Sequence, residues 1–193
     1  MQKLAVKDLY SLEEYARIRT EFRLRAMAHK KLRIVAIGAH ASVHFEDRLS
    51  MQYQVQEVLR VERIFEPDSI TEELAAYNPL IPDGHNWKAT LMVEYEDVAE
   101  RHEALKFLIG IETRAWVGVE GYDRVFAIAD EDMERTNAEK TSAVHFLRFE
   151  LTAAMIASLR HGSALSVGLD HPRYQYTQKV PQDTLESLIK DLE

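Results

Sequence analysis

Cysteine is absent from the sequence of 193 residues. Without thiols the chain cannot form disulfides, thiolate zinc sites, cysteine-ligated iron–sulfur clusters or a cysteine nucleophile. Glycine and proline are scarce as well, with 7 and 5 residues, whereas hydrophobic residues make up 46%. This composition excludes disordered, collagen-like and low-complexity proteins. A bound metal ion would need histidine and carboxylate ligands.

Long apolar runs are also missing. The N-terminal stretch MQKLAVKDLYSLEEY lacks the apolar segment of a signal peptide, and no stretch approaches the roughly 18 apolar residues of a membrane span. We therefore expect a cytoplasmic protein that does not bind membranes. The formal net charge of −8 disfavours nucleic-acid binding, because contacts to phosphates need a basic surface.

Motifs of common enzyme classes do not occur either. The sequence contains no GxxxxGK[ST], GxGxxG, GxSxG or HExxH, so it lacks the signatures of nucleotide-binding loops, serine hydrolases and zinc proteases. No glutamate has a histidine three residues later, which a carboxylate-bridged di-iron bundle requires. No cofactor is therefore evident from motifs.

Helix and strand patterns follow an order that predicts an α+β fold in a single domain covering residues 1–193. Ser11 and Glu14 form a capping-box pattern, so we expect a helix over residues 11–31, or two helices with a break near Thr20. This N-terminal helical segment should pack on the domain or project from it. A second helix is expected over residues 50–66, where Pro67 ends it or turns the chain.

The rest of the chain contains several strand patterns. Alternation predicts a strand over residues 88–95, followed by a helix over residues 98–109. The run AWVGVEGYDRVFAIA is typical of a hairpin, and EKTSAVHFLRFELT supplies a third strand. These strands predict a meander over Ala115–Leu151 within a mainly antiparallel twisted sheet that several helices flank. Thr152 should cap a further helix, with two strands and a terminal helix after it.

Basic residues are concentrated near the N-terminus, where Glu21 is the only acid between residues 17 and 33. The basic residues there are Arg17, Arg19, Arg23, Arg25, Lys30, Lys31 and Arg33. The polar side of the second helix carries Gln52, Gln56, Arg60 and Arg63. We predict that Arg17, Arg23, Arg25, Lys30, Arg60 and Arg63 bind a protein partner, or another copy of the chain in a homo-oligomer. The alternative is a solvated helix face balanced by acidic neighbours.

Glu62 interrupts the predicted core face of the second helix. At about 100° per residue, the apolar residues from Met51 to Phe65 share one face, and Glu62 falls near its middle. A buried carboxylate must be paired, protonated or bound to a metal ion, since an isolated buried charge costs several kcal/mol. We therefore take Glu62 as a candidate catalytic or metal-binding residue.

Two histidines interrupt apolar faces in the same way. His102 falls among Val98, Leu105 and Ile109 on one helix face, and His145 lies on the more apolar face of its strand. If these faces meet, Glu62, His102 and His145 could bind iron, manganese or zinc. The alternatives are a buried ion pair that fixes the packing of Glu62 and a core histidine that a carbonyl or carboxylate satisfies.

Arg148 and Glu150 lie two residues apart on the opposite face of the strand that carries His145. Neighbours on one face of a strand can pair with each other or with an adjacent strand. We interpret them as a structural ion pair.

Three segments of the chain resemble a bacterial family, the domain of unknown function 3501. They are QYQVQEVLRVERI, ELAAYNPLIPDG and IADEDMERTNAEKTSAVHFLRFEL. The resemblance extends over nearly the full length. It implies genes beside those of rubrerythrin-like proteins and iron–sulfur oxidoreductases, and thus an accessory role in redox chemistry or peroxide defence. It supplies no catalytic residues.

Two functions follow from these patterns. The first is a non-enzymatic partner protein that docks to a redox complex through its basic helices. The alternative is a metal-dependent or acid–base enzyme that uses Glu62 with His102 or His145.

Overall fold

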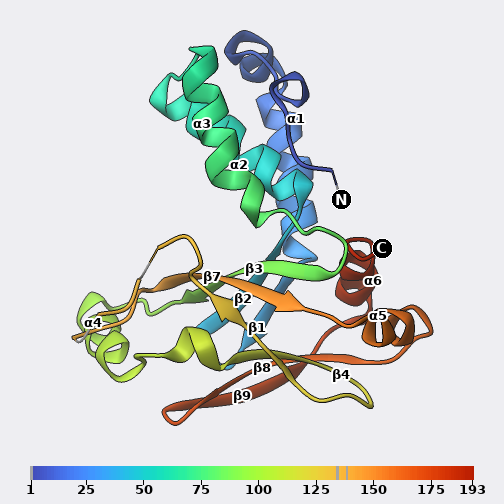
Figure 1. Cartoon of the computed structure of the whole chain (residues 1–193). Helices are drawn as coiled ribbons and strands as arrows, with labels where there is room; N and C mark the ends of the chain where they lie inside the picture. Colours follow the sequence, from blue (N-terminus) through green and yellow to red (C-terminus); the bar gives the residue numbers. More distant parts are fainter. Residues whose placement is uncertain (1, 134, 138) are drawn as a thin grey trace.

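The computed structural model describes residues 2–133, 135–137 and 139–193. Within these residues, six α-helices and two antiparallel sheets form the fold (Figure 1). The helices are α1 (Leu12–Lys31), α2 (Arg48–Glu62), α3 (Pro67–Tyr77), α4 (Val98–Phe107), α5 (Ala153–Arg160) and α6 (Gln182–Ile189). The strands are β1 (Ile34–Ile37), β2 (Ala41–Glu46), β3 (Asn86–Val93), β4 (Ala115–Val119), β5 (Val125–Phe126), β6 (Ile128–Ala129), β7 (Val144–Glu150), β8 (Leu165–His171) and β9 (Tyr174–Lys179). The α+β class and the mainly antiparallel pairing that the sequence predicted are confirmed.

Helix α1 begins at the predicted cap. Ser11 Oγ accepts a hydrogen bond from the Glu14 N–H at 3.2 Å, and the Glu14 carboxylate accepts one from the Ser11 N–H at 3.2 Å. The predicted break near Thr20 is wrong, because one threonine lowers helix propensity too little to interrupt a helix that packs on α2. Although α1 has 20 residues, no helix in the described part of the chain is both long and apolar enough to cross a membrane.

Helix α3 lies where the sequence patterns predicted only a turn. Helix α2 ends at Glu62, and Pro67 occupies the first turn of α3. The fixed φ of proline and its missing N–H suit that position. Buried Leu74 then anchors α3 beside α2.

The strands form one sheet in the order β1-β2-β3-β7-β6 and another in the order β5-β4-β8-β9. The predicted meander over Ala115–Leu151 is therefore divided between two sheets. β4 and β5 form the expected hairpin, with Val117 opposite Val125, but after Ala127 the chain enters the other sheet as β6 and then β7. Alternation along a strand shows which face is buried, but it does not show which sheet the strand joins.

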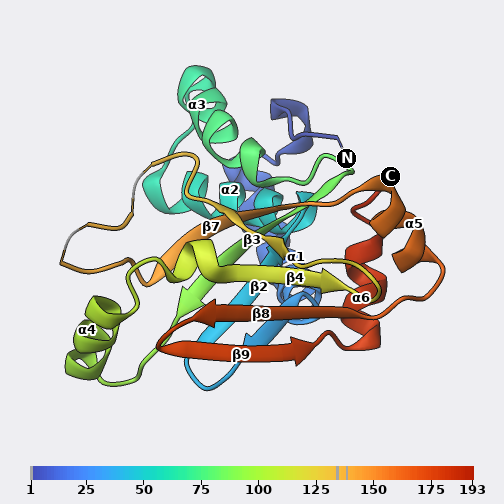
Figure 2. The ribbon, with the colours of Figure 1, turned by 60° about the horizontal axis from the view of Figure 1, so that its bottom comes forward.

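The two sheets stack as layers and enclose the main apolar core (Figure 2). Val43, Leu91 and Val167, from both sheets, are fully buried there. Helices α1, α2 and α3 rise from the outer side of the five-stranded sheet, and we call these three helices the helical lobe (Figure 1). A second, smaller core that includes Met51 and Val55 holds the lobe together.

Arg33 joins the helical lobe to β2 and to the C-terminal end of the chain. The sequence placed it among the exposed basic residues, but its side chain is buried, and the residue is 1% exposed. Its Nε donates to the Phe45 carbonyl at 3.1 Å, and Nη1 donates to the Ser187 carbonyl at 3.1 Å. Its Nη2 pairs with the Asp191 carboxylate, and Nε lies 3.8 Å from the carboxylate of Asp47. One guanidinium thus connects β2, α2 and the C-terminal segment.

The two carboxylates near Arg33 have different environments. Burial raises the pKa of Asp191 to about 6, although Arg33 opposes that shift. Asp47 caps α2 and lies 2.5 Å from His29 of α1. Although burial opposes it, His29 and Arg33 together hold the pKa of Asp47 below its ordinary value. Asp191 therefore depends on Arg33 to remain charged.

Replacing Arg33 with methionine should lower the free energy of unfolding by about 3–5 kcal/mol, because Asp191 would be left buried without its partner. Urea unfolding measures this change. The double variant Arg33→Met/Asp191→Leu should recover much of the loss, since apolar side chains can replace a buried ion pair. Equal stability of the single and double variants would contradict the assigned pairing.

Candidate functional site

Glu62 is exposed at the last residue of α2, so its predicted burial is wrong. The buried face of α2 contains Met51, Val55 and Leu59 and ends there. Arg63 takes a left-handed conformation with φ 56° and terminates the helix, and the following Phe65 is 68% exposed. A helical wheel places residues correctly only while the helix continues and a neighbour covers it.

His102 is also exposed, which is contrary to the prediction. Helix α4 lies at one end of the sheets, and Leu105 is its only described buried residue. Val98, expected beside His102 in the core, is 66% exposed. Within residues 2–133, 135–137 and 139–193, no three His, Asp or Glu side chains are placed to hold a metal ion. The structure therefore does not unite Glu62, His102 and His145, and binding of iron, manganese or zinc stays a prediction.

His145 is fully buried on β7, as its place on the apolar face predicted. Its Nδ1 lies 2.6 Å from Oδ2 of Asp130. Its Nε2 lies 2.9 Å from Oγ1 of Thr141 and 3.0 Å from the Ser142 carbonyl oxygen. Both ring nitrogens have partners, so the interpretation as a core histidine that a carboxylate and a carbonyl satisfy is confirmed.

Asp130 is fixed in place by the strand next to it. It has a left-handed backbone with φ 50°, which aspartate adopts more readily than most residues. Its N–H donates to the Phe146 carbonyl at 2.8 Å, and its Oδ1 accepts from the Phe146 N–H at 2.9 Å. Arg135 Nη1 donates to the same oxygen at 3.2 Å. These bonds hold the carboxylate against the imidazole of His145.

Glu112 supplies a second carboxylate on the other side of the imidazole. Its Oε2 is 3.8 Å from His145 Nε2. The Thr136 hydroxyl donates to Oε1 at 3.2 Å and lies 2.8 Å from the Thr141 hydroxyl. The sequence patterns did not single out Asp130, Glu112 or Thr141, because residues up to 33 positions apart meet here only through the fold. Thr141, four residues before His145 in the same stretch, was the one local signal.

The side chains around His145 have the chemical groups of a proton relay, but a substrate could not reach them. A carboxylate, an imidazole and a hydroxyl follow one another from Asp130 through His145 to Thr141, which is the order found in nucleophilic triads. Thr141, however, is 2% exposed and His145 is 0% exposed. An open depression of about 550 Å³ reaches Glu112 and Asp130 at the surface. The geometry therefore supports a structural network that fixes the loop before β7.

Arg148 and Glu150 form the predicted structural ion pair. Glu131 adds two further bonds to Arg148, each 2.7 Å long. The hydrogen bonds that Arg148 donates to Glu131 and Glu150 raise its pKa above the ordinary value. Two carboxylates therefore share one guanidinium on the outer face of the five-stranded sheet.

The basic residues of α1 divide into paired and unpaired groups. Arg19 forms two bonds of 2.8 Å to Glu57 of α2. In contrast, Arg17, Arg23, Arg25, Lys30 and Lys31 have no ion pair within the described residues. Between them Leu24 is 68% exposed and Met27 is 38% exposed. We call Arg17, Arg23, Leu24, Arg25 and Met27 the α1 surface.

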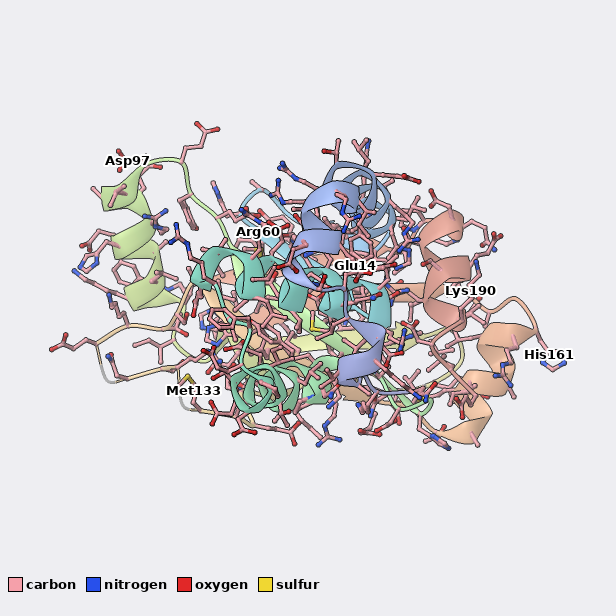
Figure 3. All side chains as sticks on the ribbon, turned by 90° about the horizontal axis from the view of Figure 1, so that it is seen from above. Glu14, Arg60, Asp97, Met133, His161 and Lys190 are labelled. Carbon is pink, nitrogen blue, oxygen red and sulfur yellow. The ribbon has the colours of Figure 1, made fainter. Side chains whose placement is uncertain are left out.

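The polar side of α2 contributes less to this surface than the sequence predicted. Gln56 is fully buried and bonds both backbone groups of Tyr10. Arg60 is exposed but pairs with Glu57 at 3.2 Å, and exposed Arg63 ends the helix. Figure 3 labels Arg60 on α2 and Glu14 on α1. Arg60 lies close to α1, because the Glu57 oxygen that it binds also accepts from Arg19. The end of α2 also has a basic residue without an ion pair among the described residues, Arg63, near exposed Val61 and Phe65, but α1 carries more such basic residues.

Comparisons with known proteins agree with the resemblance noted from the sequence. A family model described as a protein of unknown function (DUF3501) matches residues 3–192. The chain is also similar to a crystal structure of a novel protein of unknown function from Burkholderia pseudomallei K96243. The two are 49% identical, the match covers 100% of both chains, and the TM-score is 0.95. Comparison with curated proteins found no match.

Replacing His145 with alanine should lower the free energy of unfolding by about 3 kcal/mol or more, because Asp130 loses its buried partner. Urea unfolding gives the value. His102→Ala is the matched control and should change stability by less than about 0.5 kcal/mol, since His102 is exposed. Equal effects of the two substitutions would refute the assigned environments.

Glu57 should make the attachment of α1 to α2 sensitive to acid. Hydrogen bonds from Arg19, Tyr15 and Arg60 lower its pKa to about 2, against opposition from burial. A carboxylate whose pKa is lower in the folded state stabilises the fold at pH values above its pKa in the unfolded chain, about 4.5. This stabilisation is lost as the pH falls toward its folded pKa of about 2. Glu57→Gln should therefore be less stable than the natural protein at pH 7, and the difference should shrink below about pH 4.5. Urea midpoints over a pH series test this, with exposed Glu13→Gln as the control. A difference that stays constant with pH would contradict it.

Proposed function

The chain belongs to the DUF3501 family of proteins of unknown function. We propose that it is a non-enzymatic docking protein that binds an acidic protein partner through α1. The observation that carries this proposal is the α1 surface, where exposed apolar side chains lie among unpaired arginines. Such a combination is typical of protein interfaces, in which apolar contacts provide affinity and charges provide orientation.

The positive charge of the α1 surface indicates that the partner has an acidic face. The whole chain has a formal charge of −8, so a basic surface on α1 is local and would attract an acidic face against the overall charge. The segment between β3 and α4 is acidic, and it lies away from the helical lobe (Figure 1). Glu131 and Asp132, which follow β6, lie instead beside Ala76 of α3. This separation favours one orientation of a partner over the others.

The lobe holds the α1 surface in a fixed position. Tyr15 and Phe22, on the opposite side of α1, are buried at 0% and 4% exposure. The Tyr15 hydroxyl donates to Glu57 of α2 at 2.7 Å, beside the Arg19 pair. A partner would therefore meet a preorganised helix and would not need to order it, which saves conformational entropy on binding.

The first partners to test are those that the family resemblance implies, namely rubrerythrin-like proteins and iron–sulfur oxidoreductases in redox chemistry or peroxide defence. An acidic surface on such a protein would complement α1. We propose an accessory role beside these oxidoreductases, with no reaction performed by this chain.

Charge reversal on α1 tests the proposal. The variant Arg17→Glu/Arg23→Glu/Arg25→Glu should bind a purified rubrerythrin-like protein or iron–sulfur oxidoreductase from the same cell at least about tenfold more weakly than the natural protein. Binding of the natural protein should weaken as salt increases, because these charges are exposed. Isothermal titration calorimetry at low and high salt measures both effects.

A control variant carries the same change in net charge elsewhere. Arg101→Glu/Lys106→Glu/Lys179→Glu alters α4 and β9, which lie away from the lobe (Figure 1), and it should bind as the natural protein does. Equal weakening in both variants would show that only net charge matters. No detectable binding of either partner at low salt would overturn the proposal.

A further inference from the structure

Lys88 of β3 lacks the partner that a partly buried lysine usually has. It is half-buried on the outer face of the five-stranded sheet, and no hydrogen bond or ion pair to its amine occurs among the described residues. Its cross-strand neighbours are Glu46 on β2 and Arg148 on β7. A partly buried amine without a carboxylate is costly when charged.

The acidic groups nearest to Lys88 are bonded to other residues. Glu46 accepts hydrogen bonds from Ser50 at 2.6 Å and Thr90 at 2.8 Å. Glu131 is held by Arg148 at 2.7 Å. Among the described residues, neither carboxylate forms an ion pair or a hydrogen bond with the Lys88 amine.

Asp132 and Asp83 are occupied in the same way. Asp132 is held by Arg135, and Asp83 accepts from Asn86 at 2.8 Å. Burial and the adjacent Arg148 charge lower the pKa of Lys88 below its ordinary value, against opposition from Glu131 and Asp83. A lower pKa increases the fraction of the lysine amine that is neutral and able to act as a nucleophile.

A small cavity lies beside Lys88. About 110 Å³ of space lies between the outer face of the sheet and the segment from α3 to the following turn. Lys88 lines it together with an apolar rim of Ala76, Pro79, Leu80 and Phe146. The cavity accommodates only a few non-hydrogen atoms, and its apolar rim suits carbon groups.

The charges of the cavity also restrict the ligand. Arg148 lines the same space, but Glu131 and Glu150 already occupy its guanidinium. Glu131 and Asp132 add negative charge to the wall. An anionic carbonyl compound would therefore find repulsion and no vacant arginine, whereas a neutral compound would not.

We propose that Lys88 is a nucleophile that reversibly captures a small neutral aldehyde. The neutral amine adds its lone pair to the carbonyl carbon and a C–N bond forms. The resulting carbinolamine loses one water, which contains the carbonyl oxygen and both amine hydrogens, and a Schiff base remains. The step needs no oxidant or reductant, and it is independent of the proposed docking through α1.

Reductive trapping on the natural protein tests this inference. Propanal with sodium cyanoborohydride at pH 7, followed by peptide mass spectrometry, should label Lys88 about tenfold or more faster than exposed Lys106. Glyoxylate, a small anionic aldehyde, should lose most of this preference for Lys88. Lys88→Arg should remove the fast-labelled peptide, and Lys106→Arg is the matched control that should keep it.

The outcomes are distinct and do not depend on a variant that might fail to fold. Fast labelling of Lys88 by propanal but not by glyoxylate supports a neutral-aldehyde site. Labelling of Lys88 no faster than Lys106 overturns the proposal, and so does equal preference for propanal and glyoxylate.

Discussion

The guanidinium of Arg33 lies where water cannot solvate it, so the fold must supply its countercharge and its hydrogen-bond acceptors. Those acceptors come from β2 and from the C-terminal segment that follows α6, while the cap of α2 adds a second carboxylate. Strand β2, the cap of α2 and the chain end can satisfy Arg33 only if all three are in place. This requirement fixes the position of the helical lobe on the sheets.

The same physical rule separates structural from exposed polar groups throughout the molecule. His145 is completely satisfied by Asp130, Thr141 and a carbonyl, and it stiffens the loop before β7. Among the described residues, Arg17, Arg23 and Arg25 of α1 have no ion pair, and the amine of Lys88 has neither an ion pair nor a hydrogen bond. The unsatisfied groups, and not the most buried ones, are therefore the places where a second molecule would bind. This is why the proposals concern α1 and Lys88.

Local patterns predicted well wherever neighbours in sequence decide the outcome. The Ser11 cap, the hairpin of β4 and β5, and the inward face of His145 all depend on contacts or alternation within a few residues. Predictions for Glu62 and His102 failed for one shared reason. Periodicity identifies the apolar side of a helix, but burial requires another element to cover that side, and none covers these ends of α2 and α4.

The sequence by itself determined the α+β class, the order of most elements, the absence of thiol chemistry and the concentration of basic residues on the first helix. These properties follow from composition and from spacings shorter than one helix or strand. Packing between elements established that Arg33 is buried, that the strands after Ala115 belong to two sheets, and that Lys88 has no acidic partner among the described residues. Each of these depends on groups brought together from distant parts of the chain, because burial and charge pairing arise from packing between elements.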